Sequence, residues 1–184
     1  MNKIVLAALI ALAATLTGCA SPARIEQMTA HTAPEARVVK TAMSNNIAVK
    51  DVSGGKETNP MWKSNVGNSE FEQALEESLR EAGMLAAGKQ LGKYQLVAHM
   101  EAVDQPFAGF NMTVTATVNY VLVERATGKE VFSKRVALPY TARMGDAFSG
   151  VERLRLANEG AVRVNIANVI DEIRRFGLTS VAVN

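Results

Sequence analysis

Apolar and polar side chains alternate through three successive stretches between residues 94 and 141, and this pattern constrains the fold more than any other feature of the sequence. The first stretch runs from Tyr94 to Val103, and the second runs from Phe110 to Glu124. The turn residues 126–129 then lead into a third stretch, Val131 to Thr141. A period of two is typical of β-strands that bury one face. We therefore predict a three-stranded antiparallel meander with one covered face.

The same alternation predicts which side chains point to the core. These are Tyr94, Leu96, Ala98, Met100 and Ala102 in the first strand, and Met112, Val114, Ala116, Val118, Tyr120 and Leu122 in the second. Thr113, Thr115, Thr117 and Asn119 then point to the opposite face. The phase of the third strand stays open, because Lys134 shares a side with Phe132 and Val136.

Helical periodicity appears in two segments. The first covers residues 69–82, where Phe71, Ala74, Leu75, Leu79 and Ala82 fall on one face. Ser69 and Glu72 match a capping box at its start, and Gly83 fits the left-handed position after its last turn. The second covers residues 151–176 and is expected to end at Gly177, with Gly160 as a candidate kink. Its apolar stripe comprises Ala161, Val162, Ile166, Val169, Ile170 and Ile173.

A strand over residues 46–52 precedes the first helix, and residues 37–41 form a shorter candidate strand before it. The order is then strand, helix, three-stranded meander and helix. Helices that follow strands in this order pack on one face of the sheet. We predict an α+β fold, a two-layer sandwich of a mainly antiparallel sheet with two helices packed on one face.

The motif Leu16-Thr17-Gly18-Cys19 ends an apolar run that begins at Ile4, and it matches a lipobox. The small residues before Cys19 suit a peptidase that cleaves there after the thiol has been acylated. The run is shorter than the ~20 residues of a spanning helix, and Lys3 supplies the positive start of a signal peptide. The alternative is an ordinary signal peptide or membrane anchor in which Cys19 is incidental.

This N-terminus resembles that of bacterial lipoproteins, which implies palmitate and related acyl chains on Cys19 as a membrane anchor. In that class an aspartate after the cysteine favours the inner membrane, whereas Ala20 and Ser21 follow here. The resemblance therefore implies the outer membrane of a Gram-negative cell, with the domain facing the periplasm. We predict a signal peptide over 1–18, a lipidated cysteine and flexible tether over 19–36, and one α+β domain over 37–184. A coil of this length would reach ~20 to 25 Å.

Composition excludes several kinds of chemistry. The chain has 20 basic and 18 acidic residues, a balance that gives no reason to expect a nucleic-acid partner. Cys19 is the only cysteine, so its lipidation would exclude disulfides, cysteine metal sites and thiol catalysis. The sequence contains no nucleophile elbow, P-loop, zinc-protease motif or dinucleotide fingerprint. We assign no cofactor, no metal and no catalytic residue.

One enzymatic alternative stays open. His99 and Glu101 share a strand face at a spacing of two, so this pair would be able to polarise a nucleophile such as an outward threonine. The simpler interpretation is two polar residues on an exposed sheet face. His31, in the expected tether, has no second ligand nearby and is expected to be solvated.

A partner-binding surface is the main functional hypothesis. Two helices cover only one face of a sheet, which leaves Thr113, Thr115 and Thr117 on the other face for a partner. Trp62, in a loop over 53–67, and Phe107, in the turn over 104–109, are candidate aromatic anchors. The alternatives are that the threonines only favour strands and that Trp62 covers a core edge.

The order of elements, with the helix SEFEQALEESLREAG, the turn GKEVF and the helix segment EGAVRVNIANVI, resembles the small outer-membrane lipoproteins of the YajG and LptE kind. That resemblance implies a role in envelope assembly or maintenance. We expect a non-enzymatic lipoprotein that contacts the membrane through Cys19 and binds another envelope protein or lipid. The alternative is a transferase or hydrolase that acts on a lipid or sugar precursor of the envelope.

Overall fold

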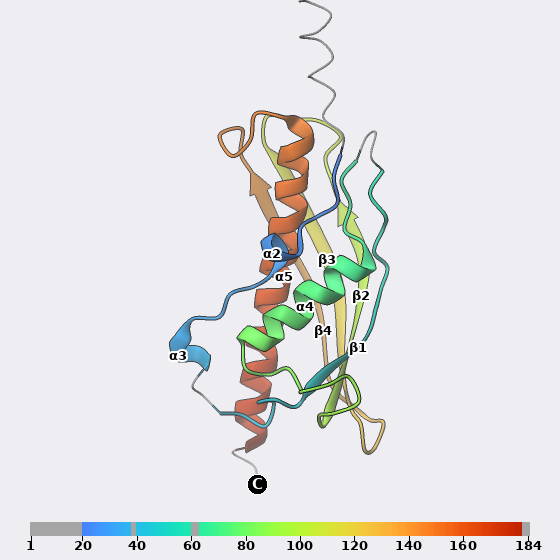
Figure 1. Ribbon diagram of the computed structural model, residues 1–184, viewed down its shortest axis with the longest axis vertical. Helices are drawn as coiled ribbons and strands as arrows, with labels where there is room; N and C mark the ends of the chain where they lie inside the picture. Colours follow the sequence, from blue (N-terminus) through green and yellow to red (C-terminus); the bar gives the residue numbers. More distant parts are fainter. Residues whose placement is uncertain (1–19, 38–39, 60–62, 182–184) are drawn as a thin grey trace, which may run out of the picture.

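A computed structural model describes residues 20–37, 40–59 and 63–181, without the side chains of residues 36 and 179–181. Two short helices come first, α2 (Ile25–Met28) and α3 (Pro34–Arg37). Strand β1 (Ile47–Ser53) and helix α4 (Asn68–Glu81) follow. The rest comprises β2 (Tyr94–Asp104), β3 (Met112–Glu124), β4 (Glu130–Ala142) and α5 (Gly150–Val181). The predicted order of strand, helix, meander and helix is confirmed (Figure 1).

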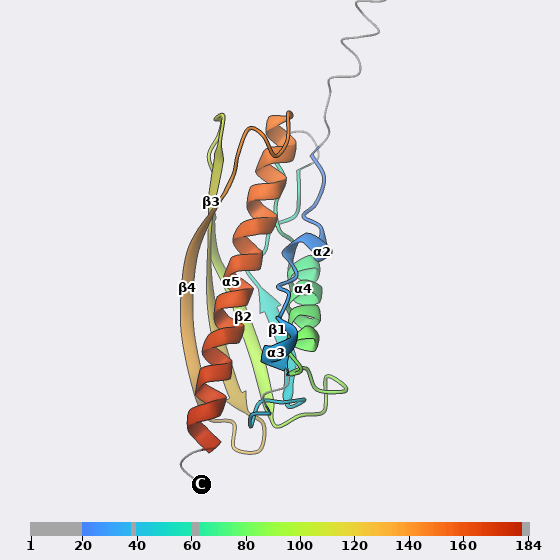
Figure 2. The same cartoon turned by 90° about the vertical axis from the view of Figure 1, so that its left-hand side faces the viewer.

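The four strands form one sheet in the order β1-β2-β3-β4. β1 runs parallel to β2, whereas β2, β3 and β4 are successively antiparallel. The parallel pair arises because α4 lies between β1 and β2 in the chain and returns it to the same end of the sheet. Helices α4 and α5 lie on one side of the sheet, and none of the described elements covers the other side (Figure 2). The predicted α+β class and two-layer packing are therefore confirmed.

The alternation in the sequence correctly predicted the buried face. All the predicted inward side chains of β3 are at most 5% exposed, and those of β2 are buried up to Met100. Beyond Met100 a bulge in the pairing of β2 with β3 interrupts the alternation, and Ala102 is only half-buried. On α4 and α5 the predicted apolar stripes are likewise buried. The core therefore lies between the sheet and these two helices.

The phase of β4 places Lys134 on the helical side together with Val136. Lys134 avoids burial because β4 is the edge strand, so its side chain reaches Glu172 of α5, with Nζ 3.6 Å from Oε1. A lysine at this position on an inner strand would have no route to solvent. The edge position therefore explains why the periodicity of β4 is the weakest of the three strands.

Several expected element boundaries differ from the structure. α4 begins one residue earlier than expected and has Gly67 at its N-cap without a side-chain cap bond, so the Ser69 and Glu72 capping box is not formed. The left-handed Gly83 is confirmed, with φ of 69°. α5 continues through Gly177 to Val181. Residues 38–39 of the candidate strand over 37–41 lie outside the described residues, and Arg37 is helical.

The segment expected to be a flexible tether is packed against the domain from Ala20 onward. Ala20, Ala23, Met28 and Ala30 are at most 5% exposed, and Met28 belongs to the core between α4 and α5. The backbone N–H of Ala30 donates to Oγ of Ser78 on α4 at 2.9 Å. The tether prediction was wrong for this part because apolar residues without helical or strand periodicity are buried here by tertiary contacts.

Candidate functional site

The open face of the sheet holds the threonines that were predicted to bind a partner. Thr113 is exposed, and its hydroxyl shares a hydrogen bond of 2.8 Å with the hydroxyl of Thr141 on β4. Thr115 is half-buried, and Thr117 is only 5% exposed. A rigid partner would therefore meet Thr113 and Thr115 but not Thr117.

Uncharged side chains flank these threonines on the neighbouring strand β4. Ala137, Pro139 and Thr141 of β4 are exposed and pair in register with Thr117, Thr115 and Thr113 of β3. We call the surface of Thr113, Thr115, Ala137, Pro139 and Thr141 the open sheet face. These five side chains are uncharged, and exposed Asp104 of β2, which pairs in register with Thr115, borders them on the other side of β3.

An ion pair marks the boundary of this uncharged surface. Nε of Arg135 on β4 donates to Oε2 of Glu101 on β2 at 2.7 Å. The two residues come from strands on either side of β3, and Arg135 pairs in register with Asn119. The pair therefore crosses β3 beyond Thr117, at the boundary of the open sheet face.

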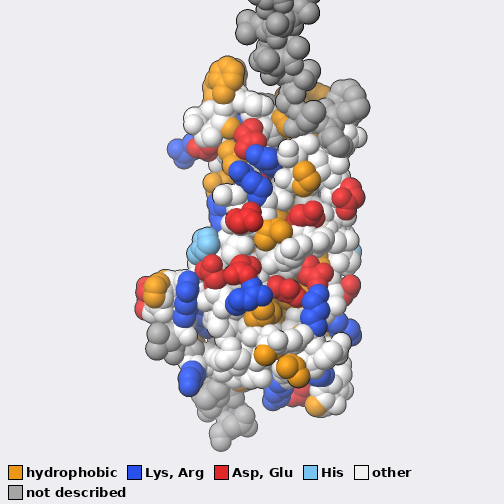
Figure 3. All heavy atoms as spheres, viewed as in Figure 1, with side chains coloured by type: hydrophobic (Ala, Val, Ile, Leu, Met, Phe, Trp, Pro, Cys, Tyr) orange, Lys and Arg blue, Asp and Glu red, His pale blue; other side chains and the backbone are white. Residues whose placement is uncertain are grey.

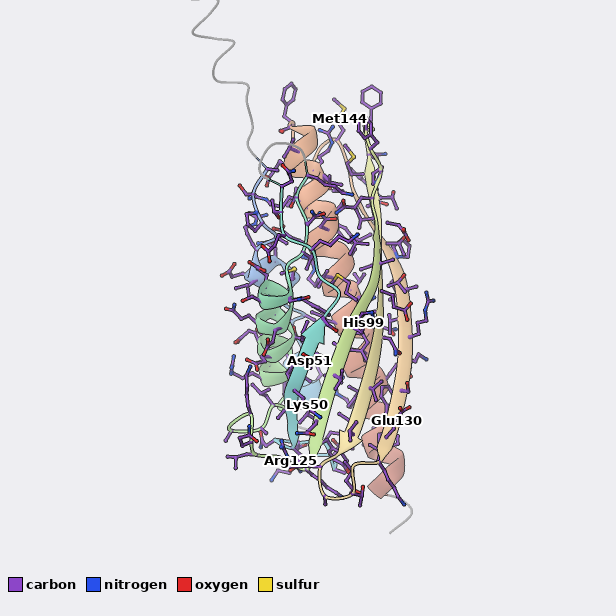
Figure 4. All side chains as sticks on the ribbon, turned by 90° about the vertical axis from the view of Figure 1, so that its right-hand side faces the viewer. Lys50, Asp51, His99, Arg125, Glu130 and Met144 are labelled. Atoms are coloured by element: carbon purple, nitrogen blue, oxygen red, sulfur yellow. The ribbon has the colours of Figure 1, made fainter. Side chains whose placement is uncertain are left out.

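His99 and Glu101, the residues of the enzymatic alternative, have different partners in the structure. Nδ1 of His99 lies 3.0 Å from Oγ of Ser53 at the end of β1, whereas Glu101 pairs with Arg135. The bulge between Met100 and Ala102 displaces Glu101 from the regular alternation that the spacing argument assumed. His99 is exposed on the side of the sheet seen in Figure 4. The enzymatic alternative requires Glu101 to orient His99 as a base, and the structure does not show this contact.

Of the two aromatic residues predicted to be anchors, only Phe107 lies within the described residues. Trp62 lies outside the described residues. Phe107 is fully exposed, in the connection between β2 and β3 at one end of the molecule. Cys19, the predicted lipidation site, also lies outside the described residues.

Grooves occur on the helical side of the domain. A groove of about 690 Å³ lies between the α2 segment and α4 and is lined by Ile25, Glu26, Gln27, Thr29, His31, Gln73, Glu76, Glu77, Arg80 and Glu81. Within it, Nδ1 of His31 lies 2.9 Å from Oε1 of Glu81. Periodicity in the sequence missed this groove because one of its walls is the segment that was expected to be a tether. Three of its acidic residues are in ion pairs, Glu76 with Lys89, Glu77 with Arg80 and Glu81 with Arg37.

The described residues contain no cluster of three or more histidine, cysteine or acidic side chains that would hold a metal ion. Within the same residues, no helix combines the length and the apolar character needed to cross a membrane. The buried hydroxyl of Tyr120 donates to Oδ1 of Asn165 at 2.9 Å, and burial raises the pKa of Tyr120. This pair is part of the core and is inaccessible to a ligand.

Comparisons with solved structures identify proteins with the same fold. A Xanthomonas campestris protein of the DUF330 family is 13% identical, with a TM-score of 0.60 over 83% of this chain and 95% of that chain. A protein from Caulobacter crescentus, described as a candidate lipoprotein, is 14% identical, with a TM-score of 0.51 over 78% of this chain and 95% of that chain. At these identities the likeness shows the fold alone. The fold thus occurs in a protein described as a candidate lipoprotein.

The chain matches no protein-family profile, and no curated protein matches its sequence. The resemblance to the YajG and LptE lipoproteins is not confirmed by these comparisons. Function therefore has to be argued from the surface of this chain.

Proposed function

We propose that this chain is a lipoprotein of the outer membrane that faces the periplasm, is anchored through acyl chains on Cys19, and binds another envelope component without catalysing a reaction. The observation that carries the binding role is the open sheet face, which none of the described elements covers. The lipobox and the occurrence of this fold in a protein described as a candidate lipoprotein support the anchor. A role in envelope assembly or maintenance, as the YajG and LptE resemblance implies, is part of the proposal.

The chemistry of the open sheet face favours a protein or lipid partner that presents an uncharged surface. The hydroxyls of Thr113 and Thr141 form one hydrogen bond with each other, so each hydroxyl can still form another with a partner. Ala137 and Pro139 add apolar contact area on the edge strand. Pro139 has no N–H, so this edge is a poor template for strand addition, and contact through the face is favoured.

Site-specific photocrosslinking in intact cells tests this proposal. A benzophenone side chain at Thr113 should form adducts with an envelope component, whereas the same side chain at Arg175, exposed on α5, should not. Thr115→Lys should abolish the Thr113 adduct because it places a long charged side chain in the middle of the open sheet face. Ala126→Lys, in the distant turn between β3 and β4, is the matched control and should leave the adduct unchanged.

Equal adducts from Thr113 and Arg175, or an adduct that survives Thr115→Lys, would refute the binding surface. The variant Cys19→Ser tests the proposed lipid anchor separately. It should take up no labelled palmitate and should no longer be found in the outer-membrane fraction. A purified transferase or hydrolase activity that His99→Ala abolishes would establish the enzymatic alternative instead.

A further inference from the structure

Exposed apolar side chains gather at one end of the molecule. Among the described residues, the exposed large hydrophobic side chains are Leu91, Phe107, Phe110, Met144, Phe148 and Leu178. Four of them lie in only two connections, the one between β2 and β3 and the one between β4 and α5. We call Phe107, Phe110, Met144 and Phe148 the apolar tip.

The three phenyl rings of the apolar tip are largely exposed, and Met144 is about half exposed. Phe107 is 106% exposed, Phe148 92%, Phe110 77% and Met144 49%. Met144 lies at the end of the molecule opposite to Arg125 and Glu130 (Figure 4). Hydrophobic side chains project at the same end in the space-filling view, over the connection between β4 and α5 (Figure 3). Three phenyl rings in water at one end are unfavourable for an isolated domain, so they indicate a surface that another phase or molecule covers.

Arg153 of α5 fixes the two connections to each other. Its side chain is 7% exposed, and Nη1 donates to the carbonyls of Ala147 and Phe148 at 2.7 and 2.8 Å. Nη2 donates to the carbonyl of Gly109 in the other connection at 3.3 Å. A buried guanidinium that holds both loops by their backbones presents the rings from a defined platform.

The first described residues are held at the same end. Ala20 is 5% exposed, and the carbonyl of Ser21 accepts a hydrogen bond of 2.9 Å from Oγ of Ser64. The carbonyl of Ser64 in turn accepts from Nε2 of Gln105, the residue two positions before Phe107 in the chain. The described chain therefore begins beside the apolar tip (Figures 1 and 2).

Cys19 precedes Ala20 directly, and consecutive Cα atoms are about 3.8 Å apart. Acyl chains on Cys19 would thus leave the domain next to the apolar tip, with no length of free chain between the packed domain and the bilayer. A tether of ~20 Å would have let the domain take any orientation. The packed segment removes that freedom.

We propose that the apolar tip inserts into the interfacial layer of the same leaflet that holds the acyl chains of Cys19. This inference rests on the lipidation in the proposed function. The bilayer covers the apolar tip in this proposal, because the lipid anchor would hold the rings against it. Phenyl rings also partition into the boundary between headgroups and acyl chains. The long axis of the domain then stands on the membrane, with the N-terminus of α5 toward the lipid.

This orientation has a consequence for the open sheet face. Helix α5 has 32 residues, so at 1.5 Å per residue it extends about 48 Å from the tip. β3 and β4 run beside α5 along the same axis (Figure 2). The open sheet face would therefore stand roughly perpendicular to the membrane, with Thr113 and Thr141, near the start of β3 and the end of β4, closest to the lipid.

Depth-dependent fluorescence quenching tests the insertion on the full acylated protein, reconstituted into vesicles of phosphatidylethanolamine and phosphatidylglycerol. Phe148→Cys supplies a single free thiol, since Cys19 would be acylated, and an environment-sensitive fluorophore is attached there. We expect blue-shifted emission that brominated acyl chains quench. Ala126→Cys, in the turn at the opposite end, is the matched control and should show neither the blue shift nor the quenching.

The rings themselves are tested in the Phe148→Cys background. Phe107→Ser with Phe110→Ser should reduce the quenching at position 148, because two of the inserted rings are lost. Leu91→Ser with Leu178→Ser removes two exposed apolar side chains outside the tip and should leave the quenching unchanged. Both double variants change only exposed residues, so circular dichroism should show the parent fold.

The outcomes separate this inference from the proposed function. The mass of the reconstituted protein reports acylation, and its absence would refute the anchor. A fluorophore at position 148 that stays unquenched in an acylated protein would refute the membrane insertion of the apolar tip but not the lipid anchor. If the unlabelled thiol of the Phe148→Cys variant instead crosslinks two copies of the chain, the tip is a self-association surface and the lipid contact is overturned.

Discussion

Glu159 on α5 is a buried carboxylate whose partners come from the beginning of the described chain. Its side chain is 1% exposed, and it accepts hydrogen bonds of 2.9 Å from the backbone N–H, Nε and Nη2 of Arg24. The hydrogen bonds to Glu159 raise the pKa of the Arg24 guanidinium above its ordinary value. A buried carboxylate costs free energy unless it is paired in this way. The pair therefore holds the first described residues against α5.

Arg24→Ala should lower the free energy of unfolding by about 3 kcal/mol, because it leaves a buried charge without its main partner. The nearest remaining cation, Nε of Arg155, lies 3.9 Å from the Glu159 carboxylate. Urea denaturation at neutral pH measures the loss. Arg80→Ala breaks the exposed pair with Glu77 on α4 and should cost no more than about 0.5 kcal/mol. Equal losses in the two variants would show that Glu159 is not effectively buried.

At this scale the sequence predicted apolar burial well and polar burial poorly. Periodicity alone places Val114, Tyr120 and Leu75 in the core, because one covered face dictates every second or every third to fourth position. Glu159 and Asn165 are equally buried, but their partners lie far away in the chain. Arg24 is 135 residues from Glu159. No local pattern encodes such a pairing.

At the scale of elements, Gly160 of α5 lies against the ring of Tyr140 on β4. A Cβ at residue 160 would lie 2.1 Å from Cδ1 of the Tyr140 ring, so only glycine leaves room for that ring. The guanidinium of Arg163 lies over the same ring, with Cζ 5.5 Å from its centroid. The sequence made Gly160 a candidate kink because the residues around a glycine inside a helix do not reveal what packs against it. The structure instead gives this glycine a packing role.

Gly160→Ala should destabilise the domain by about 1 to 3 kcal/mol, the usual cost of overpacking, although alanine is the better helix former. Thermal and urea denaturation both report the change. In a Tyr140→Ala background the ring is gone, and Gly160→Ala should then be neutral or stabilising by up to about 1 kcal/mol. A loss of the same size in both backgrounds would mean that Tyr140 is not the obstacle.

For the molecule as a whole, the chief difference from the sequence-based prediction is where the domain begins. Residues 20–36 lack a sustained period and contain two prolines, features typical of a tether. Residues 20–30 are nevertheless packed over α4 and α5, and the short helix α2 carries almost no periodic signal. Nη1 of Arg163 donates to the carbonyl of Gln27, and Ser78 holds Ala30. Long-range contacts, which composition does not reveal, thus extend the domain toward Cys19.

Met28 allows this extension to be measured, since its side chain is 0% exposed and lies in the core between α4 and α5. Met28→Ala should lower the free energy of unfolding by about 2 to 5 kcal/mol through the cavity that it leaves. Met144→Ala, at the exposed apolar tip, is the matched control and should change stability by no more than about 0.5 kcal/mol in aqueous solution. Urea denaturation compares the two. If Met28→Ala is as mild as Met144→Ala, residues 20–30 behave as the tether that their composition predicted, and the domain would not hold the proposed anchor beside the apolar tip.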